Sequence, residues 1–343
     1  MARRSTRPTR RAPEPDYDDD NGFPLLPVAA GVLVLLTALP HLLGTALIEL
    51  EVLAAQPFLR LILLILAVAV CALAVLRQQI PVAILPGLAA LFLLVETFTT
   101  MGRSPGAEAP ADRVGYLHVY SQNIGQESPE EFIGLIASGD FDVILLQEAY
   151  IGHQKGWEVL SQQLDYHLYF QVLRRDAGMG GLVMSKYPLQ PLPSLRARSW
   201  GRHIRYFPRV RIEWEQLPID VYTVHLESLA LVAGSRVLFG SSRLRLQQAE
   251  ILAREIERSN HPVILGGDLN STPLYRSSRP LRDLLNDAWT EAGWGFGYTY
   301  HATVPFARID HVLHRGFRTL SAEVVEVSNS DHRGLHVVLE PTR

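Results

Sequence analysis

The chain has 343 residues, of which 48% are hydrophobic, and a formal net charge of −3. The near balance of acidic and basic residues excludes recognition of a polyanion by bulk charge alone, and the single cysteine excludes a disulfide within the chain. The length allows one to three domains.

Three apolar runs precede residue 100 and cover residues 23–48, 57–76 and 80–95. A bilayer core needs about 17 to 25 residues of helix, which the third run reaches with residues 96–98 at the interface. Helices buried in a soluble domain need a polar face that these runs lack, and a cleaved signal peptide has only one short apolar core. We therefore predict a membrane domain, residues 23–98, with three transmembrane helices.

Five arginines precede the first run and predict the orientation of these helices. They are Arg3, Arg4, Arg7, Arg10 and Arg11. The positive-inside rule places them in the cytoplasm, so three spans would leave everything after residue 100 outside it. We expect an integral cell membrane protein with an extracytoplasmic domain, a disordered tail at residues 1–22 and a Pro-, Gly- and Ala-rich linker at residues 99–112.

Residues 113–343 alternate between strand-like and helix-like patterns. Strands are expected at residues 114–120, 142–146, 181–184, 206–214, 219–226, 263–265, 307–313, 323–327 and 335–339, and helices at residues 129–138 and 243–256. Interleaving of this kind predicts an α/β domain.

Polar residues recur where these strands end. They are Asn123, Glu148, His225, Asp268, Asn270, Asp310, Asp331 and His332. Strand ends on one edge of a sheet meet in space, where sites form in layered α/β proteins. Taken singly, each residue also suits a turn, a solvated carboxylate or an ion pair, such as Asp310 with Arg308.

The side chains of this set are of the kinds that bind a hard cation. Carboxylates without cysteine favour Mg²⁺ or Mn²⁺ over zinc, and two histidines add groups that move protons near neutrality. The set is consistent with metal-assisted attack of water on a phosphorus ester.

Seven short motifs, SQNI, LLQE, GLVMSKYPL, VHLES, GGDLN, RIDHV and SDHRGL, occur in order within residues 113–341. As an ordered set this region resembles the endonuclease/exonuclease/phosphatase superfamily, which includes pancreatic-type deoxyribonucleases, neutral sphingomyelinases and inositol polyphosphate 5-phosphatases. The resemblance implies a catalytic domain, residues 113–343, folded as a four-layered α/β/β/α sandwich with the site at one edge of the paired sheets.

The resemblance also implies roles for individual residues. Glu148 resembles the principal Mg²⁺ (or Mn²⁺) ligand of the family, with Asn123 beside it, and Asp331 is expected to be a further polar or metal contact.

The catalytic roles follow in the same way. Asp268 and Asn270 resemble the pair that orients water and contacts the scissile phosphate. His332 resembles the general base or phosphate contact, with Asp310 as its hydrogen-bond partner. His225 resembles the histidine that stabilises phosphate charge or protonates the leaving oxygen.

The substrate is less closely defined. Six arginines between residues 196 and 211 suit either an anion-binding strip or a solvated hairpin; they are Arg196, Arg198, Arg202, Arg205, Arg209 and Arg211. The apolar segment 228–239 suits a membrane-dipping loop, a buried lid or a short core helix.

We therefore predict a membrane-tethered phosphoesterase that hydrolyses phosphodiester bonds in lipid headgroups or other small phosphodiesters. An extracytoplasmic nuclease acting on nucleic acid is the alternative. A non-catalytic membrane interaction module is the third possibility, against which the complete motif set counts.

Overall fold

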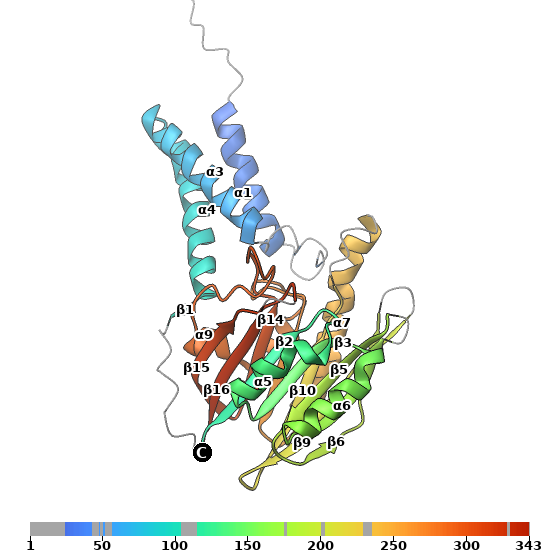
Figure 1. The fold of residues 1–343 in the computed structure, drawn as a ribbon. Helices are drawn as coiled ribbons and strands as arrows, with labels where there is room; N and C mark the ends of the chain where they lie inside the picture. The colour runs from blue at the N-terminus through green and yellow to red at the C-terminus, as the bar shows by residue number, and fades with distance from the viewer. Residues whose placement is uncertain are drawn as a thin grey trace, which may run out of the picture.

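The computed structural model describes residues 25–42, 48, 51, 57–103, 115–174, 177–199, 203–228, 235–327 and 330–342. Three N-terminal helices pack together beyond one end of an α/β domain (Figure 1). They are α1 (Leu25–Leu42), α3 (Pro57–Leu76) and α4 (Ile80–Thr99), and α4 leads into the short strand β1 (Gly102–Arg103). The predicted disordered tail and residues 104–112 of the predicted linker lie outside the described residues.

Two of these helices are long and apolar enough to cross a membrane. The segments Leu59–Leu76 and Ile80–Thr99 have mean hydropathies of 3.0 and 2.0, and only 17% and 28% of their residues are buried inside the protein. Helices of a soluble core would be mostly buried. The described part of α1 contains a shorter apolar segment, Leu25–Ala38, so the prediction of three spans is not confirmed.

The basic residue in α3 has an acidic partner on α4. Arg60 Nη2 donates a hydrogen bond to Glu96 Oε2 over 2.9 Å, and the Arg60 side chain is only 5% exposed. The ion pair lies at the end of the bundle nearest the α/β domain, because Arg60 lies in the first turn of α3 and Glu96 lies in the last turn of α4. Pairing makes a buried guanidinium tolerable in an otherwise apolar helix.

The α/β domain contains two six-stranded sheets, each mixed. In the first the strand order is β15-β16-β2-β3-β5-β4, with only β2 and β3 parallel. Its strands are β2 (Leu117–Asn123), β3 (Val143–Tyr150), β4 (His167–Arg174), β5 (Met179–Ser185), β15 (Phe317–Val325) and β16 (Gly334–Pro341).

In the second sheet the order is β12-β14-β11-β10-β9-β6, with only β10 and β11 parallel. Its strands are β6 (Leu189–Pro191), β9 (Arg209–Trp214), β10 (Leu217–His225), β11 (Val263–Asp268), β12 (Asn286–Asp287) and β14 (Asp310–Arg315). Two small ribbons pair β1 with β13 (Trp294–Gly295) and β7 (Leu195–Arg198) with β8 (Ile204–Phe207).

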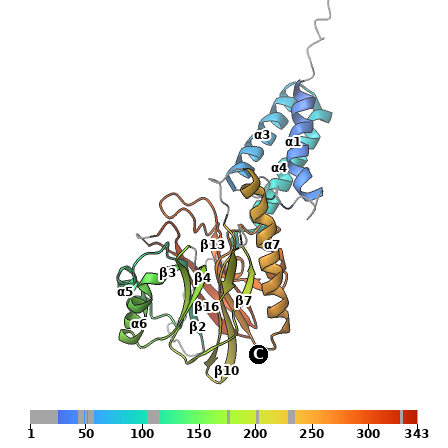
Figure 2. The same cartoon turned by 90° about the vertical axis from the view of Figure 1, so that its right-hand side faces the viewer.

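Alternating side chains build four layers. Leu145 of β3 and Ile264 of β11 belong to one buried cluster between the sheets, whereas Val263 and Leu265 point to the opposite face of β11. That face is covered by α7 (Ser235–Arg258) and α8 (Arg279–Arg282), and the outer face of the first sheet by α5 (Ile133–Gly139) and α6 (Gln154–Gln163). Figure 2 shows this α/β/β/α order edge-on, so the predicted α/β fold is confirmed.

One edge of the sandwich faces the helical bundle. Strand β16 runs from that edge toward the C-terminus, which lies at the far end of the domain (Figure 1). Since β2 is antiparallel to β16 and β14 antiparallel to β11, strands β2, β3, β10 and β11 all end at the edge where β14 and β16 begin. The strand-end residues are therefore gathered on the side of the domain that carries the apolar helices.

A buried ion pair stabilises the second sheet at its margin. Arg308 Nη1 donates to both oxygens of Asp287, over 2.9 and 2.7 Å, and Asp287 also caps α9 (Ala288–Ala292) by accepting from Trp289 N. Burial alone would raise the pKa of Asp287, but the charges and hydrogen bonds of Arg308 and His311 together outweigh it and lower this pKa well below its usual range.

The substitution Asp287→Asn is expected to lower the free energy of unfolding by about 3 to 5 kcal/mol, because it leaves the buried Arg308 charge uncompensated. Since the folded pKa of Asp287 is depressed, its stabilisation is present above the unfolded pKa and declines as the pH falls below about 4. Thermal unfolding of the detergent-solubilised chain at pH 7 and pH 3 measures both effects. The exposed Asp283→Asn is the control; equal stability of the two variants would contradict the assignment.

Candidate active site

Three acidic or basic side chains form one row across the second sheet. Asp268, the last residue of β11, pairs in register with His225 at the end of β10 and with Asp310 at the start of β14. Directly paired residues project to the same face of a sheet. The row is therefore a consequence of strand register, and all three side chains are buried.

Two glycines precede Asp268 because the backbone there has no room for side chains. A Cβ on Gly266 would approach Leu145 Cδ1 of the opposite sheet to 2.4 Å, and one on Gly267 would approach Val224 O to 1.9 Å. The two sheets come together closely at this point. Close approach brings the row within reach of the first sheet.

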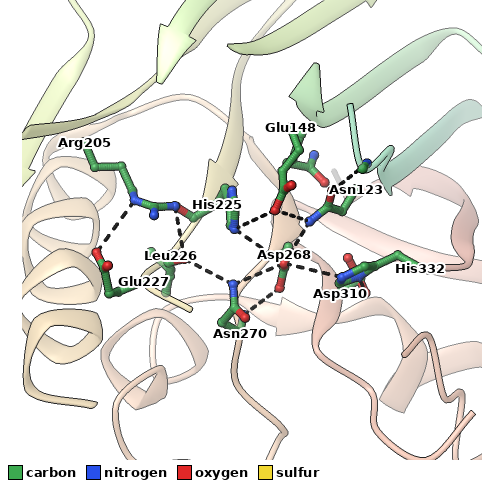
Figure 3. Close-up of polar contacts among 12 residues, drawn as sticks. Asn123, Glu148, Arg205, His225, Leu226, Glu227, Asp268, Asn270, Asp310 and His332 are labelled. Carbon is green, nitrogen blue, oxygen red and sulfur yellow. Dashed lines mark hydrogen bonds and ion pairs between the residues drawn. The ribbon is translucent and has the colours of Figure 1, made fainter. Parts of the chain in front are cut away.

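The first sheet contributes Asn123 and Glu148. Glu148 has φ +58° and lies at an irregularity in the pairing of β3 with β5, between Leu146 and Ala149. A bulge of this kind re-aims one side chain of a strand, and a positive φ is costly for a residue other than glycine. Asn123 Nδ2 donates to Glu148 Oε1 and to Asp268 Oδ2, each over 3.1 Å, and so joins the two sheets (Figure 3).

His332 enters the site just before β16. Its Nδ1 lies 2.8 Å from Asp310 Oδ2, and because a carboxylate only accepts, Nδ1 carries the proton and donates. Its Nε2 then faces Asp268 Oδ2 at 3.9 Å. Ser330 anchors this segment by accepting from His332 N and donating to Asn123 O.

Burial and neighbouring charge set the protonation of these groups. Burial raises the pKa of Asp268, and the Asp310 carboxylate raises it further. Burial alone would lower the pKa of His332, but Asp310 outweighs it and raises the pKa to about 10. The pKa of His225 is lowered well below its usual value by burial and then by the Arg205 and His332 charges. The two histidines are thus driven toward opposite charge states.

His225 is buried, and neither of its ring nitrogens makes a hydrogen bond within the part of the chain that the structure describes. Its Nε2 lies 3.5 Å from Glu148 Oε1 and 3.6 Å from Asp268 Oδ2. Asp310 Oδ1 is also buried and accepts no hydrogen bond from any described residue. Buried polar atoms are almost always satisfied, so unsatisfied atoms aimed into one site indicate that a ligand completes it.

The donor set suits a divalent cation. Ligand atoms of Glu148, His225 and Asp268 lie within 4.8 Å of one another, as do those of Asp268, Asp310 and His332. Asp268 belongs to both groups. The carboxylate oxygens suit a hard divalent cation, and a cation between them would relieve the repulsion of the buried Asp268 and Asp310 carboxylates.

The remaining two predicted site residues differ in position. Asn270, with φ +47°, turns back so that its Nδ2 donates to Asp268 Oδ2 and Leu226 O, over 3.1 and 3.2 Å. It holds the Asp268 carboxylate in place. Asp331, in contrast, is exposed and belongs to neither group of candidate cation ligands.

The six arginines between residues 196 and 211, which suited either an anion-binding strip or a solvated hairpin, do not form a continuous strip among the described residues. Arg205 is buried, donates to the carbonyls of His225 and Leu226, and lies 3.9 Å from Glu227 (Figure 3). Arg209 and Arg211 are ion-paired, Arg196 and Arg198 are exposed on β7, and Arg202 lies outside the described residues. Arg205 therefore holds the end of β10 at His225 in place.

Tyr300 is a neighbour of the site that strand-end reasoning missed. Its ring packs on that of His332 at a centroid distance of 4.9 Å, and its backbone forms an isolated bridge with the same residue. It belongs to an irregular loop, 296–306, in which the sequence shows no strand or motif. Residues 229–234 of the apolar segment 228–239 lie outside the described residues, and residues 235–239 begin α7.

Solved structures share this architecture. A catalytic domain of human Nocturnin superposes with a TM-score of 0.53 at 16% identity, covering 66% of this chain and 95% of that one. An endonuclease/exonuclease/phosphatase from Bacteroides vulgatus gives 0.53 at 17% identity, covering 66% and 99%. A humanized TDP2 of D. rerio gives 0.51 at 16% identity, covering 66% and 99%. At such identities the likeness shows the fold alone.

No curated protein matches the chain by sequence. The model of the Endonuclease/Exonuclease/phosphatase family, in contrast, matches residues 120–332. That range is more than half of the chain and includes every candidate site residue from Asn123 to His332. This chain therefore belongs to the endonuclease/exonuclease/phosphatase family, as the resemblance of its motifs predicts.

Proposed function

We propose that this protein is a membrane-anchored, Mg²⁺- or Mn²⁺-dependent phosphoesterase that hydrolyses phosphodiester bonds, with phospholipid headgroups as its substrates. Members of the family are typically hydrolases of phosphoester bonds. The observation that carries the proposal is the pair of candidate cation groups that share Asp268, at the sandwich edge that faces the apolar helices.

Side chains from both sheets contribute to the proposed site. Glu148, with Asn123 beside it, would hold the cation together with Asp268, and Asp331 would be an outer contact. A divalent ion bound there would supply Lewis-acid polarisation of a phosphoryl oxygen. Asn270 fixes the orientation of the Asp268 carboxylate, which accepts a proton from the attacking water.

The histidines act on the phosphate itself. Asp310 holds His332 through Nδ1, so His332 Nε2 is directed at the place where a phosphoryl oxygen would lie near Asp268. His225, whose ring nitrogens make no hydrogen bond among the described residues, contacts the same phosphate from the Glu148 side. In the proposed reaction the water oxygen forms a bond to phosphorus, the bond from phosphorus to the leaving oxygen breaks, and a histidine returns a proton to that oxygen.

A nuclease is the alternative activity, since the family also acts on nucleic acids. Tracking of a nucleic-acid backbone needs a stripe of available cations. Three of the six arginines that could form such a stripe are already engaged. Arg205 is buried beside Glu227, and Arg209 and Arg211 are ion-paired. The lipid substrate is therefore preferred.

A substrate panel tests this preference. The full chain in mixed phosphatidylcholine and phosphatidylglycerol vesicles would be given those lipids, single-stranded DNA, RNA and bis(p-nitrophenyl) phosphate, each with Mg²⁺. We expect hydrolysis of phospholipid and of the small diester. Degradation of nucleic acid without any hydrolysis of lipid would overturn the lipid assignment in favour of the nuclease.

We also propose that all three apolar helices, α1, α3 and α4, span the cell membrane, because an odd number of spans places the N-terminus in the cytoplasm and the catalytic domain outside. The five N-terminal arginines support this orientation. A reporter that is active only after export, fused after residue 105, is expected to be active. A silent reporter, with one fused before residue 23 active, would reverse the topology.

A further inference from the structure

A cavity of about 310 Å³ lies where the apolar helices meet the catalytic domain. Leu61 and Leu64 of α3 and Thr97 of α4 form one wall. The catalytic domain supplies the other, and its main members are Pro273, Leu274, Phe296, Tyr298 and Phe306. The lining is mostly apolar, and it is made jointly by two parts of the chain that sequence alone would treat as separate domains.

The two walls are held together by specific contacts. Strand β1, which directly follows α4, pairs with β13 in the register Gly102↔Gly295. Arg308 Nη2 donates to Thr100 O over 3.1 Å. The end of α4 is therefore fixed to the catalytic domain on both sides of the turn that joins it to β1.

A second contact secures the segment between α1 and α3. Glu51 accepts from Arg245 Nη2 over 3.1 Å and from Ser277 N over 2.8 Å, and the Glu51 and Arg245 side chains are 3% and 0% exposed. A buried ion pair of this kind needs a matching geometry on both sides. The cavity between the helices and the domain is therefore a built feature of the fold.

Exposed apolar side chains surround the cavity, as is typical of a protein surface that contacts a membrane. Leu61, in its wall, is 54% exposed on the outer face of α3, the face that would contact lipid if this helix spans the bilayer. On the domain side, Phe296, Val304 and Phe306 are 40%, 72% and 43% exposed. Exposed aromatic and aliphatic side chains beside apolar helices are typical of a membrane interface. The cavity is thus continuous with a surface suited to hydrocarbon.

The cavity shares a wall with the catalytic centre. The Phe306 ring, which lines it, packs edge-on against Tyr300 at 5.5 Å between centroids, and Tyr300 packs on His332 at 4.9 Å. Arg308, whose guanidinium is ion-paired with Asp287, also lines the cavity.

We propose that this cavity binds an acyl chain of the phospholipid substrate, so that the lipid is hydrolysed without leaving the bilayer. The proposal rests on the proposed function and adds to it the means of substrate selection. An acyl chain seated between α3 and the 296–306 loop brings the headgroup phosphate to the side of Tyr300 that carries His332. Soluble diesters, which lack the chain, bind the catalytic centre alone.

The test uses the full chain in phosphatidylcholine vesicles that contain a phosphatidylcholine with a diazirine in one acyl chain. Photolysis is expected to label residues 61–64 and the 296–306 loop. Leu64→Trp fills the cavity from the helix side. It should lower the labelling, and should lower the ratio of lipid to bis(p-nitrophenyl) phosphate turnover about tenfold or more, because several methylenes lose their apolar contacts. Leu274→Trp fills it from the domain side and should do the same.

The control is Leu66→Trp, which makes the same substitution on an exposed part of α3 outside the cavity and should change neither measurement. Labelling that is the same in Leu64→Trp, Leu274→Trp and the unaltered chain would overturn the acyl-chain site. If labelling follows the cavity but no diester is hydrolysed by the unaltered chain, the proposed function fails while the lipid site stands. The two failures are therefore distinguishable.

Discussion

Replacing Glu148 or Asp268 by alanine is expected to reduce the hydrolysis of bis(p-nitrophenyl) phosphate about a thousandfold or more. Each substitution removes a carboxylate from a candidate cation group, and Asp268→Ala removes the residue that both groups share. Loss of a proton acceptor alone costs about 10² to 10⁴ in rate, and loss of a cation ligand adds to it. Initial rates in saturating Mg²⁺ measure the effect.

Folding must be separated from catalysis in this test. Both side chains lie at the strand-end edge and outside the apolar core clusters, and removal of the buried Asp268 carboxylate, whose pKa is raised by burial and by Asp310, relieves its repulsion with Asp310. The unfolding temperature is therefore expected to be equal to or above that of the unaltered chain. Glu158→Ala is the control, because the Glu158 carboxylate is exposed on α6, where it accepts a hydrogen bond from Gln154, and belongs to neither candidate cation group. Full activity in Glu148→Ala or Asp268→Ala would refute the assigned site.

The second large effect is expected from the Asp310–His332 pair. His332→Ala should lower the rate about 10² to 10⁴-fold, since it removes the imidazole that faces the phosphate position. Asp310→Asn should lower it as well, because an amide holds the ring less strongly in the required tautomer. Residues that act as one unit give non-additive losses. The double variant should therefore be little slower than His332→Ala, in rates measured with the same diester.

Additive losses would contradict this coupling and would assign Asp310 a separate role, such as direct contact with a cation. The matched control is Asp283→Asn, which makes the same change on an exposed carboxylate away from the centre. It should leave both the rate and the coupling unchanged.

Much of the site follows from strand patterns. The pattern of Val263 to Asp268, an apolar run closed by two glycines and a carboxylate, predicts a strand that ends in a site, and β11 ends at Asp268. His225 and Asp310 end or begin strands, and register alone places them beside Asp268. The ordered motifs indicate the family, and the resemblance to the family implies the two stacked sheets. Periodicity could not by itself show which strands are neighbours.

Other features depend on contacts between residues far apart in the chain. The position of the Glu148 side chain depends on a bulge against β5, which no local pattern marks. Arg205 resembles an exposed strand residue in sequence, but its partners are the carbonyls at the end of β10. The ion pair of Glu51 with Arg245 joins residues separated by 194 positions, so the docking of the helices on the domain was not predictable from either segment alone.

Composition predicted the membrane-spanning helices only in part. Composition predicts that α3 and α4 can cross a bilayer, and the structure agrees that they are long and mostly unburied. For the first apolar run, the described helix Leu25–Leu42 contains prolines and a shorter apolar segment. Length and hydropathy therefore support α3 and α4 as membrane spans more strongly than they support α1.

The central claim is that side chains from two sheets hold a divalent cation where a phosphate ester can be hydrolysed. The most direct measurement is the rate of bis(p-nitrophenyl) phosphate hydrolysis by the full chain, first with Mg²⁺, then after excess EDTA, then after Mg²⁺ is restored. We predict activity that is lost with the chelator and recovered with the ion, and that is absent in Asp268→Ala throughout. Activity that persists in EDTA, or that survives in Asp268→Ala, would contradict the claim.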